Sequence, residues 1–271
     1  MRKLSAFIHH IPELVEWFKE FTEIDYSTLE RDHPLWLYYE EYEKWSINHF
    51  GKQPIKFDDI SNKIIDFGSF LKVVQLFQHQ IKDKIKNNFI SDLKDKSTCY
   101  GVLFEIRILG HFYKLGVENL SYRDNHIDGK NPDIMFTTRE LRRVFVECTR
   151  KYAKSDRSNS DIVLIEDLIR SLNAKAIEYK DLPVPLIYAV HVPEDIDFAR
   201  DKFKTELKNK LYEIVKLVIF RNVNYVVFSS YKSPEKKPLN VRGDVIFNTD
   251  LDRLLYQNQF VDPKFKVDMN F

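Results

Sequence analysis

The chain has 271 residues, of which 44% are hydrophobic and 31% are charged, a composition that fits a globular protein with a substantial core. Its 42 basic and 41 acidic residues nearly cancel, so overall charge indicates neither a nucleic-acid nor a membrane partner. Two cysteines cannot form a disulfide framework, and the seven glycines never take the spacing of a dinucleotide-binding loop or a P-loop. Because long apolar runs and a signal-peptide pattern are absent, we expect a soluble, cytoplasmic protein with no membrane partner.

Residues 1–95 are expected to form a helical N-terminal subdomain. Helical stretches are predicted near the N-terminus, with Pro12 in a first turn, and over residues 35–50 and 58–90. The first of these carries its apolar side chains at helical spacing, at Ile11, Leu14, Val15 and Phe18. All three tryptophans lie in the first 45 residues. Aromatic side chains at helical spacing pack in a core more often than they bind a ligand, so we expect burial.

Residues 96–235 alternate between helical and strand patterns and are expected to form an α/β core. Ser97 or Thr98 is expected to cap a helix that ends at Leu115, before Gly116. Further helices are predicted over 160–180, with Ile177 on the apolar side, and over 198–220. Strands are predicted over 132–138, 142–151, 185–192 and 223–231. This order indicates a mixed central sheet flanked by helices, and residues 236–271 are expected to be a C-terminal extension packed on the core.

Two carboxylates stand out in the first two of these strands. Asp133 follows Pro132 at the start of one strand, and Glu147 lies between Val146 and Cys148 inside the next. A charged group in an apolar strand is costly unless it is compensated, and neighbouring hairpin strands would bring the two acids together. Paired carboxylates suit Mg²⁺, which keeps several of its waters. Glu105, in an apolar part of the preceding helix, is a third candidate ligand.

This pattern resembles the PD-(D/E)xK nuclease superfamily, which has the restriction-endonuclease-like fold. The resemblance covers residues 97–231. It implies that Asp133, Glu147 and Glu105 bind Mg²⁺, with Mn²⁺ as a substitute, and that a lysine two residues after the second acid assists the attacking water. Position 149 is threonine instead. Because alternate residues of a strand point to the same face, Lys151 is one candidate for the missing lysine. In this family the lysine can also come from a neighbouring helix, which makes Lys175 or Lys180 a further candidate.

The expected function is therefore Mg²⁺-dependent hydrolysis of phosphodiester bonds, in DNA rather than RNA, with a homodimer as a further expected partner. Seven basic residues against three acidic ones in 139–157 agree with a phosphate-bearing substrate. Because Thr149 replaces the lysine, a degenerate member that binds nucleic acid or a protein without cutting is the alternative. The acids also have structural interpretations: Asp133 as a turn residue bonded to backbone N–H groups, and Glu147 paired with Arg142, Arg143 or Arg150.

Overall fold

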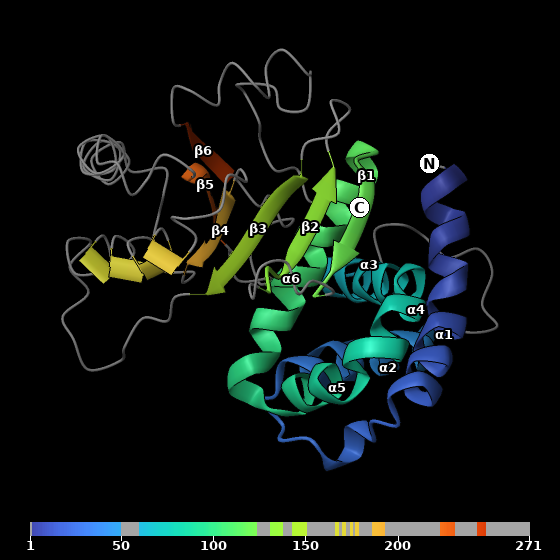
Figure 1. The fold of residues 1–271 in the computed structure, drawn as a ribbon. Helices are drawn as coiled ribbons and strands as arrows, with labels where there is room; N and C mark the ends of the chain where they lie inside the picture. Colours follow the sequence, from blue (N-terminus) through green and yellow to red (C-terminus); the bar gives the residue numbers. More distant parts are fainter. Residues whose placement is uncertain are drawn as a thin grey trace. The chain divides into compact units, whose positions relative to one another are not determined.

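The computed structural model describes most of the first 150 residues and parts of the remainder. The described residues are 2–49, 60–123, 131–137, 143–150, 166–167, 170–171, 174–175, 177–178, 186–192, 223–230 and 243–247. The chain divides into two compact units, residues 1–110 and 111–270. The division falls within helix α6 (Lys96–Leu115), later than the boundary at residue 95 that the sequence suggested. Together the two units make a mixed α/β protein (Figure 1).

The described residues of the first unit are helical, as the sequence predicted. They form α1 (Arg2–Thr22), the 3-10 helix η1 (Tyr26–Thr28), α2 (Pro34–His49), α3 (Asn62–Leu76), the single turn α4 (Gln78–Gln80), the π-helix η3 (Ile81–Ile85), α5 (Lys86–Lys94) and most of α6. The stretch expected to be one helix over 58–90 is thus interrupted after Leu76 and contains a π-helical turn, a feature that apolar periodicity does not reveal. Pro12 lies inside α1 rather than in its first turn.

Apolar and aromatic side chains from α1, α2 and α3 form the core of the first unit. The four α1 residues predicted to face inward, Ile11, Leu14, Val15 and Phe18, are all buried. Gly68 of α3 allows α1 to approach closely, because a Cβ there would lie only 2.8 Å from atoms of Ile11. Trp45 is buried as expected, whereas Trp36 and Tyr39 are only half-buried. The aromatic side chains of α2 therefore lie partly in the core and partly at the surface.

A buried polar cluster joins three helices of this unit. The Arg107 guanidinium on α6 donates to Asp66 Oδ2 on α3 at 2.7 Å and to the Tyr38 hydroxyl on α2 at 2.8 Å. Burial raises the pKa of the Asp66 carboxyl above its ordinary value, against the lowering effects of Arg107 and Tyr38. Because both charged side chains are almost wholly removed from water, each depends on the other for compensation.

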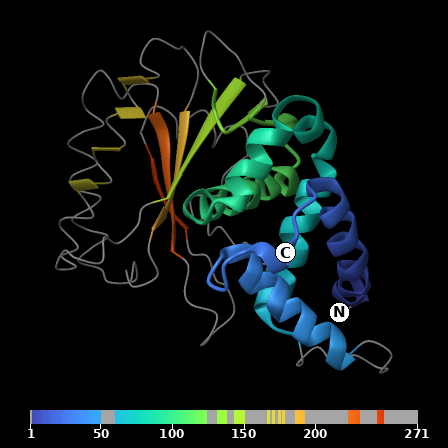
Figure 2. The same ribbon diagram turned by 90° about the horizontal axis from the view of Figure 1, so that it is seen from below.

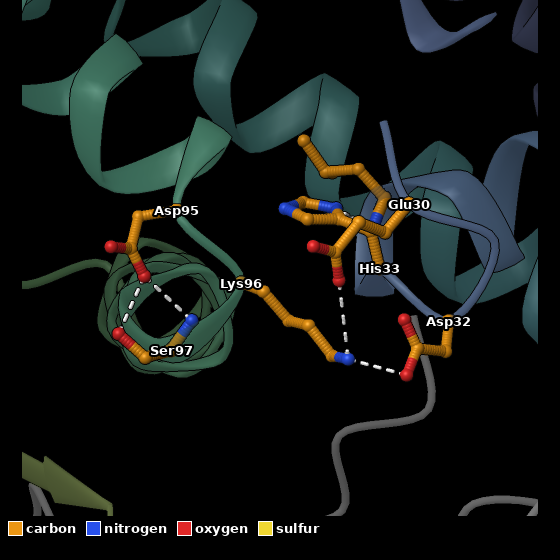
Figure 3. A network of polar contacts seen from close by, with 7 residues as sticks. Glu30, Asp32, His33, Asp95, Lys96 and Ser97 are labelled. Carbon is orange, nitrogen blue, oxygen red and sulfur yellow. Dashed lines mark hydrogen bonds and ion pairs between the residues drawn. The ribbon is translucent and has the colours of Figure 1, made fainter. Parts of the chain in front are cut away.

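Helix α6 begins at a carboxylate cap rather than at the hydroxyl cap that the sequence suggested. Asp95 Oδ1 accepts a hydrogen bond of 2.7 Å from the backbone N–H of Ser97 (Figure 3). It accepts a second one, of 3.2 Å, from the backbone N–H of Thr98. The next residue, Lys96, pairs with Glu30 and Asp32 in the turn before α2. Helix α6 ends at Leu115 as predicted, and Gly116 adopts a φ of 69° that favours glycine.

The second unit contains a six-stranded mixed sheet. Its strands are β1 (Glu118–Tyr122), β2 (Ile134–Thr137), β3 (Arg143–Arg150), β4 (Leu186–Val192), β5 (Val223–Ser230) and β6 (Gly243–Phe247), in that spatial order (Figure 1). The β3–β4 and β4–β5 pairs are parallel, and the other three pairs are antiparallel. Strands β2 to β5 match the four predicted strands, and β1 and β6 were not predicted.

Helical residues lie against both faces of the sheet. Phe112, in the last turn of α6, packs against Phe136 of β2, with the two tilted rings 4.7 Å apart between centroids. The described residues between 166 and 178 are helical and lie along the other face, where Ser171 and Lys175 contact residues of β3 and β4 (Figure 2). Ile177, which the sequence assigned to the buried side of this helix, is 54% exposed. The predicted helix over 198–220 lies outside the described residues.

None of the helices within the described ranges combines the length and apolar character that crossing a membrane requires.

Candidate functional site

The two carboxylates singled out from the sequence lie on the β2–β3 hairpin, Glu147 within β3 and Asp133 directly before β2. Ile134 of β2 pairs with Val146 of β3, so the next position outward places Asp133 opposite Glu147. Directly opposed residues of an antiparallel pair share one face of the sheet, with Cβ atoms roughly 4.5–5.5 Å apart. The register therefore puts these two acids at neighbouring positions of the hairpin, and their role as metal ligands stays a prediction.

The Asp133 carboxylate is anchored to β3. Its Oδ2 accepts a hydrogen bond of 2.7 Å from the backbone N–H of Cys148, the residue after Glu147. Its own carbonyl oxygen accepts a hydrogen bond of 2.8 Å from the backbone N–H of Arg123, just after β1. Asp133 thus satisfies a backbone donor, as the structural interpretation of this residue expected. The donor lies across the hairpin rather than in a local turn, which fixes the carboxylate beside Glu147.

Glu147 is buried in the middle of the sheet and is paired with a lysine from the helix above it. Lys175 Nζ lies 2.8 Å from Glu147 Oε2 and 3.1 Å from Glu178 Oε2. Only 5% of the Glu147 side chain is exposed, against 29% for Lys175. The sequence interpretation offered neighbouring arginines as ion-pair partners. The described partner is one of the two helix lysines offered for the missing strand lysine, and the side chains of Arg142 and Arg150 lie outside the described residues.

The surroundings of Lys175 keep its side chain protonated. Burial by itself lowers the pKa of an ammonium group, but the charge and hydrogen bond of Glu147, aided by Glu178, outweigh this effect. The net result is a Lys175 pKa above its ordinary value of 10.5. Lys175 is therefore a fixed positive charge at neutral pH, suited to electrostatic stabilisation and to donating hydrogen bonds.

Tyr188 of β4 completes the polar group on this face of the sheet. It stands beside Glu147 in the parallel β3–β4 register, and its hydroxyl lies 2.6 Å from Ser171 Oγ. Burial raises the Tyr188 pKa, against lowering by hydrogen bonds to Ser171 and Thr149. Thr149, which occupies the usual lysine position, is thus hydrogen-bonded to a neighbouring strand. The sequence analysis did not identify Tyr188 or Ser171. It recognised their strand and helix from the apolar residues and assigned no role to the polar side chains among them.

The structure describes only some of the other predicted site residues. Glu105 is buried on the part of α6 that belongs to the first unit, and its role as a ligand stays a prediction. Lys151 and Lys180 lie outside the described residues. Of the basic residues in 139–157, Arg143 is described and exposed, whereas the side chains of the others fall outside the described part.

The carboxylate oxygens of Asp133 and Glu147 are ligands that suit a divalent cation such as Mg²⁺ or Mn²⁺. Each carboxylate offers two oxygens, and the bonds described above engage Oδ2 of Asp133 and Oε2 of Glu147. Among the described residues there is no cluster of three or more His, Cys, Asp or Glu side chains that could hold a metal. Two carboxylates with water suit Mg²⁺ or Mn²⁺ and do not suit Zn²⁺, which prefers nitrogen and sulfur ligands.

Comparison of the chain with protein-family models, with curated proteins and with solved structures finds no match.

Proposed function

We propose that the second unit is a metal-dependent nuclease with a restriction-endonuclease-like core, hydrolysing phosphodiester bonds in DNA. The observation that carries this proposal is the Asp133–Glu147 pair on neighbouring strands with Lys175 2.8 Å from Glu147. Two acids and a cation on one sheet face are the chemical parts that phosphodiester hydrolysis needs. The strand order, antiparallel at β2–β3 and parallel at β3–β4, agrees with the arrangement implied by the resemblance.

Asp133 and Glu147 would hold Mg²⁺, with Mn²⁺ able to replace it. When bound there, the ion would polarise the scissile phosphate and lower the pKa of an attacking water. Asp133 is well positioned for this role because the Cys148 N–H fixes one of its oxygens and therefore its orientation. Glu147 is held in the same way by the Lys175 ammonium.

Lys175 would take the part of the lysine that position 149 lacks. Because its raised pKa keeps it charged, Lys175 would orient the water and offset negative charge on the phosphate rather than remove a proton. Lys151 remains the competing candidate from strand parity. The two are separated by replacing each in turn, Lys175→Met and Lys151→Ala, and measuring cleavage under the same conditions.

The proposal is tested by incubating the full chain with plasmid DNA and with RNA in the presence of Mg²⁺, Mn²⁺ or a chelator. The matched variant is Asp133→Asn, whose amide oxygen can still accept the Cys148 N–H hydrogen bond and so preserve the hairpin. We expect metal-dependent cleavage of DNA by the wild type and its loss in the variant. Equal cleavage by both proteins, or none with either metal, would refute the proposal.

A nuclease-fold protein that binds without cutting is the second candidate. It is favoured by Thr149, which carries no charge and is hydrogen-bonded to Tyr188. In that case Lys175 acts only to compensate the buried Glu147. Calorimetry distinguishes the two candidates: absence of Mn²⁺ binding together with retained DNA binding supports the non-cutting protein, whereas Mn²⁺ binding that Asp133→Asn weakens supports the nuclease.

A further inference from the structure

A separate pocket lies in the first unit, between the end of α1 and one face of α2. It has a volume of about 470 Å³, within the range of small-ligand sites. Its walls are formed by Lys19, Glu23, Ile24, Asp25, Tyr26, Ser27, Trp36, Tyr39 and Glu43. Trp36, Tyr39 and Glu43 recur at helical spacing, so α2 presents them on one face. Glu23 has a φ of 55° and lies just after α1, where the chain enters the turn that contributes Ile24 to Ser27 to the pocket lining.

One wall of the pocket carries a stacked pair of tyrosine rings. Tyr26 is 2% exposed, and its ring stacks on Tyr39 with centroids 4.3 Å apart and an interplanar angle of 2°. Its hydroxyl oxygen has no hydrogen-bond partner among the described residues. Because this hydroxyl is buried away from solvent, Tyr26 contributes its ring to the wall rather than a hydrogen-bonding group. The stacked Tyr26 and Tyr39 rings and Trp36 give the pocket an aromatic side.

The charged groups around the pocket are predominantly acidic. Lys19 contributes one positive charge against three carboxylates, Glu23, Asp25 and Glu43, a net charge of −2. The Lys19 ammonium is already engaged, 3.1 Å from Glu16 Oε1 and 3.2 Å from the Tyr39 hydroxyl. Hydrogen bonds from Ser27 hold the pKa of the Asp25 carboxyl below its ordinary value, so it stays charged. The pocket therefore attracts cations and repels phosphates.

We propose that this pocket binds a guanidinium group, from a small guanidine or from an arginine side chain. A guanidinium is planar and stacks on the half-buried Trp36 ring. Its N–H groups donate to the Glu43 carboxylate. A quaternary ammonium would satisfy the aromatic ring and the charge but could not donate a hydrogen bond to Glu43. The proposal is independent of the nuclease assignment, because it rests on residues of the first unit alone.

The test is calorimetric titration of the full chain with N-acetyl-argininamide and with its neutral isostere N-acetyl-citrullinamide. We expect the arginine compound to bind at least about tenfold more tightly, since only charge and one donor group distinguish the two. Agmatine and an arginine-containing peptide separate the two sources: tighter binding of the peptide assigns the site to a polypeptide, and tighter binding of agmatine to a small molecule. Equal affinity for the arginine and citrulline compounds, or preference for adenosine monophosphate, would overturn the proposal.

Three variants locate the binding in this pocket. Trp36→Leu removes the stacking surface and should weaken binding about tenfold or more, while Glu43→Gln should weaken it about threefold. Glu40→Gln is the matched control, because Glu40 lies on the same helix, is paired with Lys44, and does not line the pocket. Circular dichroism verifies that each variant is folded. Unchanged affinity in both Trp36→Leu and Glu43→Gln would show that the guanidinium binds elsewhere and would overturn the proposal.

Discussion

Lys175 Nζ and Glu147 Oε2 lie 2.8 Å apart, joining a strand of the sheet to the helix that covers it. Glu147 is buried, so its charge requires a compensating partner, and Lys175 supplies it. Ser171 lies one helical turn before Lys175 and contacts Tyr188, so the helix face toward the sheet carries polar contacts in addition to any apolar ones. A helix that places a cation over a buried acid beside Asp133 is the basis of the functional proposal.

Loss of the Lys175 ammonium should destabilise the second unit. The Lys175→Met change leaves the buried Glu147 charge without this partner, and we expect a loss of about 3 kcal/mol in the free energy of unfolding, measured by urea denaturation. Adding Glu147→Gln to the Lys175→Met variant should restore part of the lost free energy of unfolding, because the uncompensated charge is removed. The control is Arg170→Ala on the same helix, because Arg170 is exposed and its pair with Asp167 is worth less than about 0.5 kcal/mol. Equal losses in Lys175→Met and Arg170→Ala would contradict the buried-pair account.

The buried Arg107–Asp66 pair should stabilise the first unit about as much as the Lys175–Glu147 pair stabilises the second. We expect Arg107→Met to reduce the free energy of unfolding by about 3 kcal/mol, because Asp66 is left charged or must be protonated within the core. Tyr38→Phe, which removes the hydroxyl bonded to Arg107 and to Asp66, should reduce it by about 1–2 kcal/mol. The exposed Lys44–Glu40 pair is the control, and Lys44→Ala should have an effect below about 0.5 kcal/mol. A Lys44→Ala effect as large as that of Arg107→Met would refute this assignment.

His111, in the last turns of α6, should make stability depend on pH. Burial, aided by the nearby charge of Lys114, lowers the pKa of His111 from 6.5 to about 4. Between these values the unfolded chain binds the extra proton, so the contribution of neutral His111 is complete above pH 6.5 and is lost as pH falls toward 4. At about 1.4 kcal/mol per pKa unit the loss amounts to about 3 kcal/mol.

Thermal or urea unfolding of wild type and His111→Gln across this range measures the difference directly. The wild type should lose more stability than the variant between pH 6.5 and 4, because glutamine does not titrate. Parallel pH curves for the two proteins would show that His111 titrates alike in the folded and unfolded states.

The Asp95 cap should stabilise the start of α6. Asp95→Ala removes the acceptor for the Ser97 and Thr98 N–H groups and should cost about 1 kcal/mol in unfolding free energy. Asp95→Asn keeps an acceptor oxygen and should lose far less. If asparagine and alanine are equally destabilising, the effect of Asp95 is due to its charge at the helix N-terminus rather than to capping.

Local patterns predicted the strands and the carboxylate pair well, because both depend on neighbouring residues. Alternation within 142–151 and the apolar runs of 185–192 and 223–231 specify strands, and hairpin geometry then brings Asp133 to Glu147. Strand β1 was missed because Glu118–Tyr122 is mostly polar and only Tyr122 is buried, so it lacks an apolar signal. The pairing of Lys175 with Glu147 depends on where a helix lies over the sheet, which no local pattern specifies.

The same reasoning explains the incomplete prediction of the aromatic residues in the first unit. Helical spacing correctly indicated that Trp45 is buried, but Trp36 and Tyr39 occupy a neighbouring face that lines a pocket. Which face of α2 packs inward depends on the positions of α1 and α3. Hydroxyl capping of α6 was predicted from Ser97 and Thr98, whereas the cap is Asp95, because the helix begins one position before Ser97.

The central claim, that Asp133, Glu147 and Lys175 form a phosphodiester-cleaving site, is tested most directly by single-turnover cleavage of plasmid DNA with Mg²⁺. Wild type, Lys175→Met and Lys151→Ala are compared at equal protein concentration, with urea denaturation verifying that each is folded under assay conditions. The account predicts cleavage by the wild type, a loss of about 100-fold or more in Lys175→Met, and near wild-type cleavage in Lys151→Ala. A wild type that does not cut, or a folded Lys175→Met variant that cuts at the wild-type rate, would contradict it.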